Sequence, residues 1–155
     1  MNATVGFDLI FSREDLQAAL FVSLLTACLI VGLLAYLNRS EKRRYFTIWT
    51  VAWVFYALWL LFNYRLQDTQ EDALGFVLKQ CCIGASAVFL LWGSAEFLRI
   101  KTRGHILGLF LVFLVIWSCI GAFHLDRPLE FQIPLFSLIG LTSLLTSWCY
   151  FHSRR

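Results

Sequence analysis

The stretch LNRSEKRRYFTIWTVAWVFYALWLLFNYRL, residues 37–66, places a cluster of cations directly before a long aromatic and aliphatic run. The cluster contains Arg39, Lys42, Arg43 and Arg44. A soluble domain has little use for this boundary, whereas a membrane protein needs one wherever its chain leaves the bilayer on the cytoplasmic side. The stretch therefore predicts a cytoplasmic anchor followed by a membrane-spanning helix, with Tyr45 and Trp49 at the start of its interfacial belt.

The composition of the whole chain extends this interpretation. Of the 155 residues, 59% are hydrophobic and 17% aromatic, whereas soluble domains are about 45–50% apolar. The few charged residues separate apolar runs of roughly 17 to 25 residues, the length that crosses a bilayer as a helix. Runs such as GLFLVFLVIW, residues 108–117, do not alternate as barrel strands would. The predicted fold class is all-α: a polytopic membrane helical bundle.

Five membrane spans are predicted within one domain covering residues 1–155. Their expected ranges are 16–37, 45–64, 73–98, 104–124 and 130–151. Ser12 and Asp15 have the spacing of a capping box and predict a helix start near Arg13. Thr69 and Asp72 repeat that spacing before the third span. The first apolar run has no small-residue cleavage site, so we expect the first span to stay in the mature protein.

The distribution of Lys and Arg predicts the orientation of the spans. With five spans, the first and third connections and the C-terminus fall on one side, and together they carry most of the cations. These are Arg39, Lys42, Arg43, Arg44, Arg99, Lys101, Arg103, Arg154 and Arg155. Short cytoplasmic loops retain positive charge. We therefore expect the N-terminus outside and the C-terminus in the cytoplasm of a cell membrane.

Lys79 is the one clearly intramembrane charge in the predicted spans. It lies in the third span, about two turns from the outer end, where its stem can extend toward the headgroups and pair with Glu71, Asp72 or Asp68. Charges inside a membrane are also candidates for functional sites. Lys79 therefore has two interpretations, a structural interfacial lysine or a ligand-binding residue.

Other polar and aromatic residues predict how the helices pack and where a ligand could bind. Ser86 lies on the third span, which is rich in small residues. Because small residues let neighbouring helices approach closely, we expect this span at the centre of the bundle. Thr142 and Thr146 belong to a hydroxyl stripe on the fifth span, which either bonds to its own carbonyls or lines a polar cavity. Trp53 and Tyr56 on the second span either pack against other helices or line a pocket for an apolar ligand.

A second small-residue motif predicts a helix contact. Gly104 and Gly108 form a small-xxx-small pair at the inner end of the fourth span, a spacing typical of close helix packing in membranes.

The sequence contains no recognisable catalytic or cofactor-binding motif. The five cysteines lack metal-type Cys-x-x-Cys spacing. Packing explains them, although Cys81, Cys82 and Cys119 share the outer halves of adjacent spans and leave a redox or copper site as an alternative. His105 and His152 lie at the rim of the bundle rather than at the depth of haem ligands. We predict no enzyme activity, metal or cofactor, and no nucleic-acid partner.

The motif RRYFTIWTVAWVFYALWLLF, residues 43–62, is a basic loop that leads into an aromatic span. It resembles the N-terminal membrane region of bacterial sensor histidine kinases and diguanylate cyclases. The resemblance covers mainly residues 39–66 and, more loosely, the hydropathy of the whole chain. It implies a multi-helix module of the bacterial inner membrane, with a cytoplasmic output domain attached after CYFHSRR, residues 149–155.

Two classes of function follow from these patterns. The first is a sensory or interaction module that couples a ligand, lipid or partner signal to a cytoplasmic signalling domain or partner. The second is a small oligomeric transporter or channel subunit, in which Lys79 and the hydroxyl stripe line a path. Transporters usually contain broken helices or ionisable groups near the midplane. The sequence favours the first class, with the lipid bilayer and a homo-oligomer or cytoplasmic partner as its interactions.

Overall fold

The computed structural model describes residues 13–65, 73–99 and 104–123, together with residues 133–134, 136–137, 139–141, 143–144, 147–148 and 151. The described part is all-helical. Its four helices are α1 (Arg13–Glu41), α2 (Arg44–Arg65), α3 (Ala73–Phe97) and α4 (Gly104–Ala122). The described residues between 133 and 151 are also helical, in the range of the predicted fifth span.

The predicted ranges of the first four spans agree with the observed helices to within a few residues. The described part of α1 begins at Arg13, and the residues before it, with Ser12 of the expected capping box, lie outside the described residues. The largest difference is at the other end of α1, which continues about one turn past the predicted boundary to Glu41. This extra turn is polar, so hydropathy alone ended the prediction too early. The helix continues because its backbone hydrogen bonds do not require an apolar side chain.

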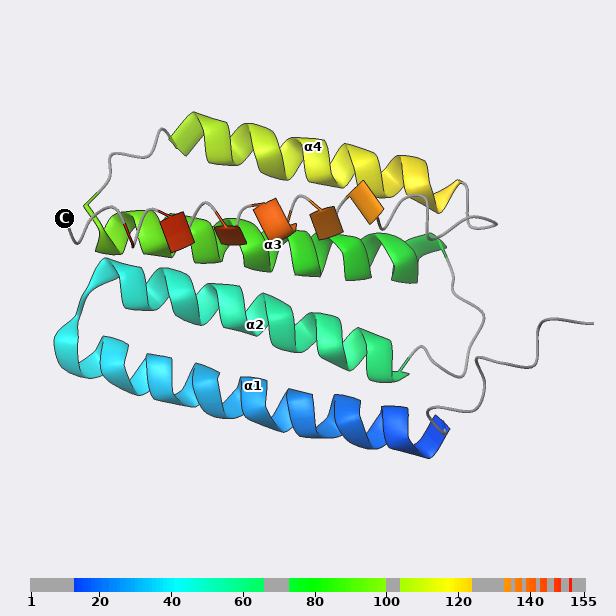
Figure 1. The fold of residues 1–155 in the computed structure, drawn as a ribbon, viewed down its shortest axis with the longest axis horizontal. Helices are drawn as coiled ribbons and strands as arrows, with labels where there is room; N and C mark the ends of the chain where they lie inside the picture. Colours follow the sequence, from blue (N-terminus) through cyan, green and yellow to red (C-terminus); the bar gives the residue numbers. More distant parts are fainter. Residues whose placement is uncertain are drawn as a thin grey trace, which may run out of the picture.

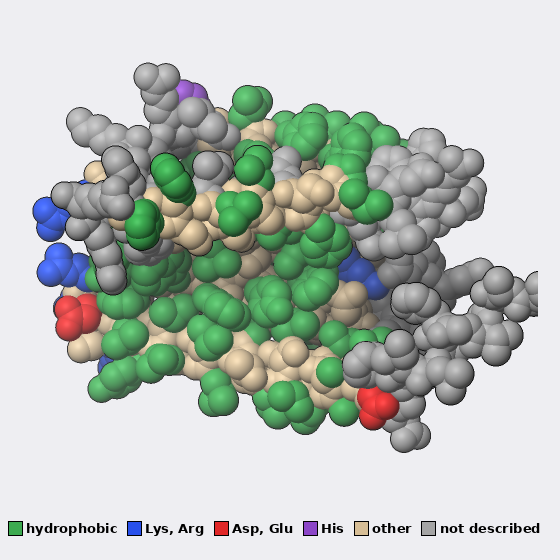
Figure 2. Space-filling view, viewed as in Figure 1, with side chains coloured by type: hydrophobic (Ala, Val, Ile, Leu, Met, Phe, Trp, Pro, Cys, Tyr) green, Lys and Arg blue, Asp and Glu red, His purple; other side chains and the backbone are tan. Residues whose placement is uncertain are grey.

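Three of the described helices are long and apolar enough to cross a membrane. They cover Asp15–Glu41, Arg44–Arg65 and Ala73–Phe97, and Leu107–Ala122 forms a shorter apolar helix. Apolar side chains occupy much of the face of the described helices that is seen in Figure 2. Leu29, for example, is 75% exposed and Val22 61% exposed, both on α1. A surface of this kind is stable in lipid rather than in water, which is consistent with a membrane protein.

The four helices form a row in the order of the chain. Contacts join α1 to α2, α2 to α3 and α3 to α4, and the helices lie side by side in that order in Figure 1. The helical pieces between residues 133 and 151 run along α3 in the same view, and Ile139 packs against the core formed by Ile83 and Leu114. The row therefore has α3 in its interior and α1 at its edge.

The central position predicted for the third span is confirmed by burial. Half of the most apolar stretch of α3 is buried, compared with 11% of that of α2 and 6% of that of α1. Two glycines on opposite faces of α3 let its neighbours approach. A Cβ atom added to Gly84 would overlap the side chain of Leu114 on α4, and one added to Gly93 would overlap the indole of Trp49 on α2.

Gly108, one half of the second small-residue motif, makes no close helix contact among the described residues. Nothing lies within 4 Å of a Cβ atom built at Gly108, and Gly108 is exposed. Close packing of α4 instead uses Leu114 against Gly84. The i, i+4 spacing places two small residues on one face of a helix but does not say which face a neighbouring helix covers.

The basic residues of two separate connections meet at one end of the bundle. This end is formed by the α1–α2 connection, with Arg43 and Arg44, and by the end of α3, with Arg99. Lys42 and Arg99 follow the ends of α1 and α3 with positive φ angles of 51° and 57°. The Lys42 N–H donates to the Asn38 carbonyl (2.9 Å) and the Arg99 N–H to the Glu96 carbonyl (3.1 Å). Both helices therefore end in left-handed caps at the same end of the molecule, called here the basic end.

Candidate functional site

A groove of about 340 Å³ runs along the middle of α3, between α2 and the helical pieces of residues 133–151. Its wall is mainly apolar, with four hydroxyl-bearing side chains. The lining residues are Tyr56, Ile83, Ser86, Ala87, Leu90, Leu91, Ser94, Ile139 and Ser143. The volume lies within the roughly 300–1,000 Å³ of ordinary small-molecule sites. We call this site the α3 groove.

The groove exists because α3 presents small side chains where its neighbours present large ones. Ser86, Leu90 and Ser94 follow one another at intervals of four residues and so share a face of the helix. Beside them, Ala87 leaves space that a larger side chain would fill. Tyr56 of α2 and Ile139 lie opposite this face of α3, and both pack against the core formed by Ile83 and Leu114. The floor of the groove therefore belongs to α3. One wall belongs to α2, and the other is formed by Ile139 and Ser143 from the helical pieces between residues 133 and 151, called here the 133–151 segment.

The tyrosine on the α2 wall is held by its aromatic neighbours. The Tyr56 ring lies 5.4 Å from the Trp53 ring at 82° and 5.7 Å from the Trp59 ring at 29°. Aromatic pairs at these separations stabilise one another beyond simple burial. Tyr56 is only half-buried. Its position is thus fixed while part of its surface remains available to a ligand.

The serines give the groove a small number of hydrogen-bonding groups. Ser86 is 3% exposed and Ser94 7% exposed. The Ser143 hydroxyl donates to the Ile139 carbonyl (2.9 Å), and the Ser147 hydroxyl donates to the Ser143 carbonyl (3.0 Å). The described serines of the hydroxyl stripe therefore bond to their own helix, one of the two arrangements expected from the sequence. The Ser143 oxygen keeps lone pairs that can accept from a ligand.

The structure brings together only some of the residues predicted to bind a ligand. Tyr56 and Ser86 both line the α3 groove. Trp53 lies next to the groove, where its ring contacts the ring of Tyr56. Lys79 is half-buried in the second turn of α3 and does not line the groove. Thr142 and Thr146 lie outside the described residues, as do the acids proposed to pair with Lys79.

Sequence reasoning missed several residues of the groove. The clearest are Ser94, Leu90 and Ile139. The four-residue spacing from Ser86 through Leu90 to Ser94 was a readable signal for the first two. Nothing local in the sequence identifies Ile139, because its place opposite α3 depends on how distant parts of the chain pack.

The α3 face next to the groove also carries a buried amide. Gln80 is 6% exposed, and its Oε1 atom has no hydrogen-bond partner among the residues that the structure describes. An unpaired buried acceptor destabilises a fold by about 1–3 kcal/mol. Gln80 lies less than one turn before Ile83, a groove residue, but does not itself line the groove.

The cysteines do not form a metal centre in the described part of the chain. Cys82 is buried and Cys81 half-buried on α3, while Cys119 is exposed on α4. Among the described residues, no group of three or more His, Cys, Asp or Glu side chains is placed to hold a metal ion. The described cysteines are all free.

Comparison with known proteins adds no assignment to these observations. No family model, curated protein sequence or solved structure matches the chain.

Proposed function

We propose that the chain is a membrane-embedded sensory or interaction module that binds an apolar ligand in the α3 groove. In this proposal the chain spans the bilayer five times, with the basic end in the cytoplasm. The three long apolar helices support the membrane location. The gathering of Arg43, Arg44 and Arg99 at one end supports the orientation, because cytoplasmic connections retain positive charge.

The observation that carries the proposal is the position and lining of the groove. It runs along α3 from Ile83 to Ser94, so in the proposed topology it extends from the depth of the acyl chains toward the interface at the basic end. Its wall is apolar apart from Tyr56 and three serines. A site of this composition suits a membrane-dissolved molecule that is mostly hydrocarbon and carries one or two hydrogen-bonding groups.

In this proposal α3 couples the groove to the cytoplasm, because one continuous helix extends from the groove to the basic end. The same helix forms the groove floor as far as Ser94 and then carries Glu96 and Phe97 at the basic end. A ligand that separates the 133–151 segment from α3 would favour one position of this helix over another. Because a ligand shifts a two-state equilibrium only by its differential affinity, the signal is the change in α3 position at the basic end.

Filling the groove tests the proposal. The probe is a long-chain alcohol that carries a photoreactive diazirine, added to the purified full chain in nanodiscs, with labelled peptides identified by mass spectrometry. The unmodified chain should be labelled on α3 and on residues 133–151. Ala87→Phe should reduce this labelling at least fivefold, because the ring occupies the groove. Ala35→Phe, at an exposed position on α1, should leave it unchanged. Equal labelling of both variants would remove the groove as a ligand site.

The alternative, a small oligomeric transporter or channel subunit, has less support. In the described part of the chain, α1 to α4 are unbroken, and the Asp, Glu, Lys, Arg and His side chains lie within about two turns of the helix ends. Transport paths usually need broken helices or ionisable groups at mid-depth. A flux assay in proteoliposomes discriminates the two: ion or solute flux that requires this chain would favour the transporter.

A further inference from the structure

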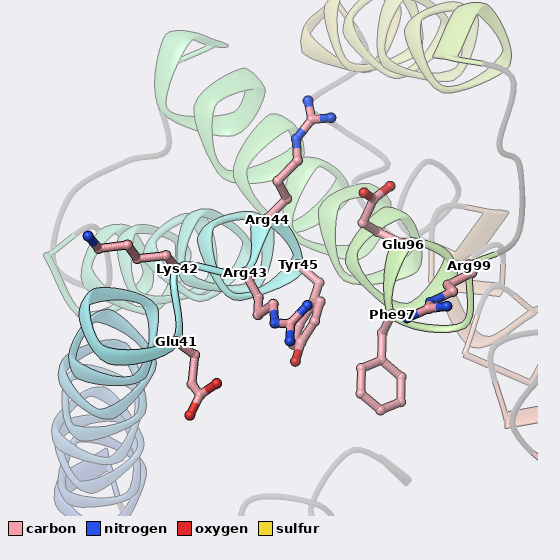
Figure 3. A pocket seen from close by; sticks show the side chains of 8 residues that line it. All are labelled: Glu41, Lys42, Arg43, Arg44, Tyr45, Glu96, Phe97 and Arg99. Carbon is pink, nitrogen blue, oxygen red and sulfur yellow. The ribbon is translucent and has the colours of Figure 1, made fainter.

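A second cavity, separate from the α3 groove, lies at the basic end and has a volume of about 570 Å³. The α1–α2 connection and the end of α3 enclose it together (Figure 3). It has four cationic side chains, two carboxylates and two aromatic rings. The lining residues are Glu41, Lys42, Arg43, Arg44, Tyr45, Glu96, Phe97 and Arg99. Cations outnumber acids in the lining, so the cavity attracts anions.

Two arginines, Arg43 and Arg99, line the cavity from opposite sides and are the proposed donors to an anion. In Figure 3, Arg43 comes from the α1–α2 connection and Arg99 from the end of α3, while Lys42 and Arg44 extend in other directions. A guanidinium is a planar donor fork that binds phosphate oxygens in pairs, whereas an ammonium binds as a point charge. Two such forks, one from the α1–α2 connection and one from the turn that follows α3, can bind one phosphate together, and the other two cations add to the positive field.

The aromatic floor of the cavity is rigid. The Tyr45 ring meets the Phe97 ring edge-on at 5.2 Å and 83°, and Phe97 lies 5.8 Å from Trp49. Trp49 in turn rests on Gly93 of α3. These contacts pack α2 against α3 at this end of the bundle, next to the residues that line the cavity.

We propose that the basic-end cavity binds a phosphate ester, with the headgroup of an acidic phospholipid as its source. The aromatic floor favours the lipid over a soluble phosphate: Tyr45, Trp49 and Phe97 form an interfacial belt between the cations and the apolar spans. Basic pockets between membrane helices on the cytoplasmic side suit acidic headgroups. A bound lipid would join the α1–α2 connection to the end of α3.

The test uses the purified full chain and native mass spectrometry to count bound lipids and measure their affinity. The probes are phosphatidylglycerol, phosphatidylcholine as the zwitterionic comparison, and glycerol 3-phosphate as the soluble ester. We expect saturable binding of phosphatidylglycerol, at least tenfold tighter than that of phosphatidylcholine. Displacement of phosphatidylglycerol by micromolar glycerol 3-phosphate would contradict a lipid source, whereas displacement only above millimolar concentrations supports it.

Matched variants separate a defined site from general attraction to positive charge. Arg43→Gln with Arg99→Gln should weaken phosphatidylglycerol binding about ten- to thirtyfold, the change expected when two cations near an acidic headgroup are lost. Arg39→Gln with Arg65→Gln removes the same charge from exposed positions outside the cavity. This control should change the affinity less than threefold. Equal losses in the two double variants would overturn the proposal.

A third variant distinguishes loss of the binding site from a folding defect. Glu96→Gln removes a carboxylate from the cavity lining and should tighten phosphatidylglycerol binding about threefold or more, by removing repulsion of the phosphate. A misfolded protein would not gain affinity. Unchanged or weaker binding by this variant, with an unchanged melting temperature, would also overturn the proposal.

Discussion

The indole of Trp49 on α2 rests against the bare backbone of Gly93 on α3, so closely that a Cβ atom there would lie 2.6 Å from the indole Nε1. This contact sets how near the two helices come at the basic end. The same indole packs against Tyr45 and Phe97, at ring separations of 5.4 and 5.8 Å. One glycine therefore positions the aromatic floor on which the basic-end cavity is built.

Gly93→Ala should destabilise the protein by about 1–3 kcal/mol, because overpacking forces a rigid indole or the backbone to move. The measurement is the midpoint of thermal unfolding in detergent. Gly108→Ala is the matched control, since nothing lies within 4 Å of its Cβ position. Alanine there should leave stability unchanged or raise it slightly through its better helix propensity. Equal effects of the two substitutions would show that the Trp49 contact does not determine packing.

The contact between Gly84 and Leu114 predicts coupling between α3 and α4. A Cβ atom at Gly84 would overlap the Leu114 side chain, which is 3% exposed. Gly84→Ala and Leu114→Ala should each lower stability, the first by overpacking and the second by leaving a cavity. Because the second change makes room for the first, the double variant should lose about 1 kcal/mol less than the sum. Simple additivity in the double-mutant cycle would argue against the contact.

The unpaired Oε1 of Gln80 predicts a stabilising substitution. Gln80→Met keeps the length of the side chain and removes a buried acceptor that has no hydrogen-bond partner in the described part of the chain. Unfolding in detergent should require about 1–2 kcal/mol more free energy, the cost of leaving such a group unpaired. The control is Gln17→Met on α1, which is only half-buried and should change stability by less than about 0.5 kcal/mol. Destabilisation by Gln80→Met would mean that the amide makes a necessary interaction.

Lys79 was one of the residues expected from the sequence to bind a ligand, and the structure places it outside the α3 groove. Lys79→Met keeps the apolar stem and removes the charge. We expect photolabelling of the groove by the diazirine alcohol to match that of the unmodified chain, whereas Ala87→Phe lowers it. The melting temperature should change little, since a half-buried interfacial charge contributes on the order of 1 kcal/mol or less. Loss of labelling with an unchanged melting temperature would return Lys79 to the site.

The sequence predicted the helices well because a hydrophobic run is a local property. The ranges of α1 to α4 follow from run length and from the residues that flank each run. The central place of α3 also followed from its small residues. These features need no knowledge of which other segments lie nearby.

The groove was only partly predictable because it depends on contacts between distant residues. Tyr56 and Ser86 were identified from their chemistry, but Ile139 reaches the site only through packing of the 133–151 segment along α3. The register of α3 against its neighbours depends on Gly93 with Trp49 and on Gly84 with Leu114. Spacing along one helix shows which residues share a face, but not which helix covers that face.

Cysteine labelling in sealed cells tests most directly the central claim, a membrane module with its basic end in the cytoplasm. In a chain whose native cysteines are replaced by serine or alanine, single cysteines are placed at Ser40 and Ala73, exposed positions at the two ends of the bundle. A membrane-impermeant maleimide added outside should label position 73 and leave position 40 unlabelled until the membrane is permeabilised. Labelling of position 40 in intact cells, with position 73 protected, would contradict the proposed orientation and the cytoplasmic place of the basic end.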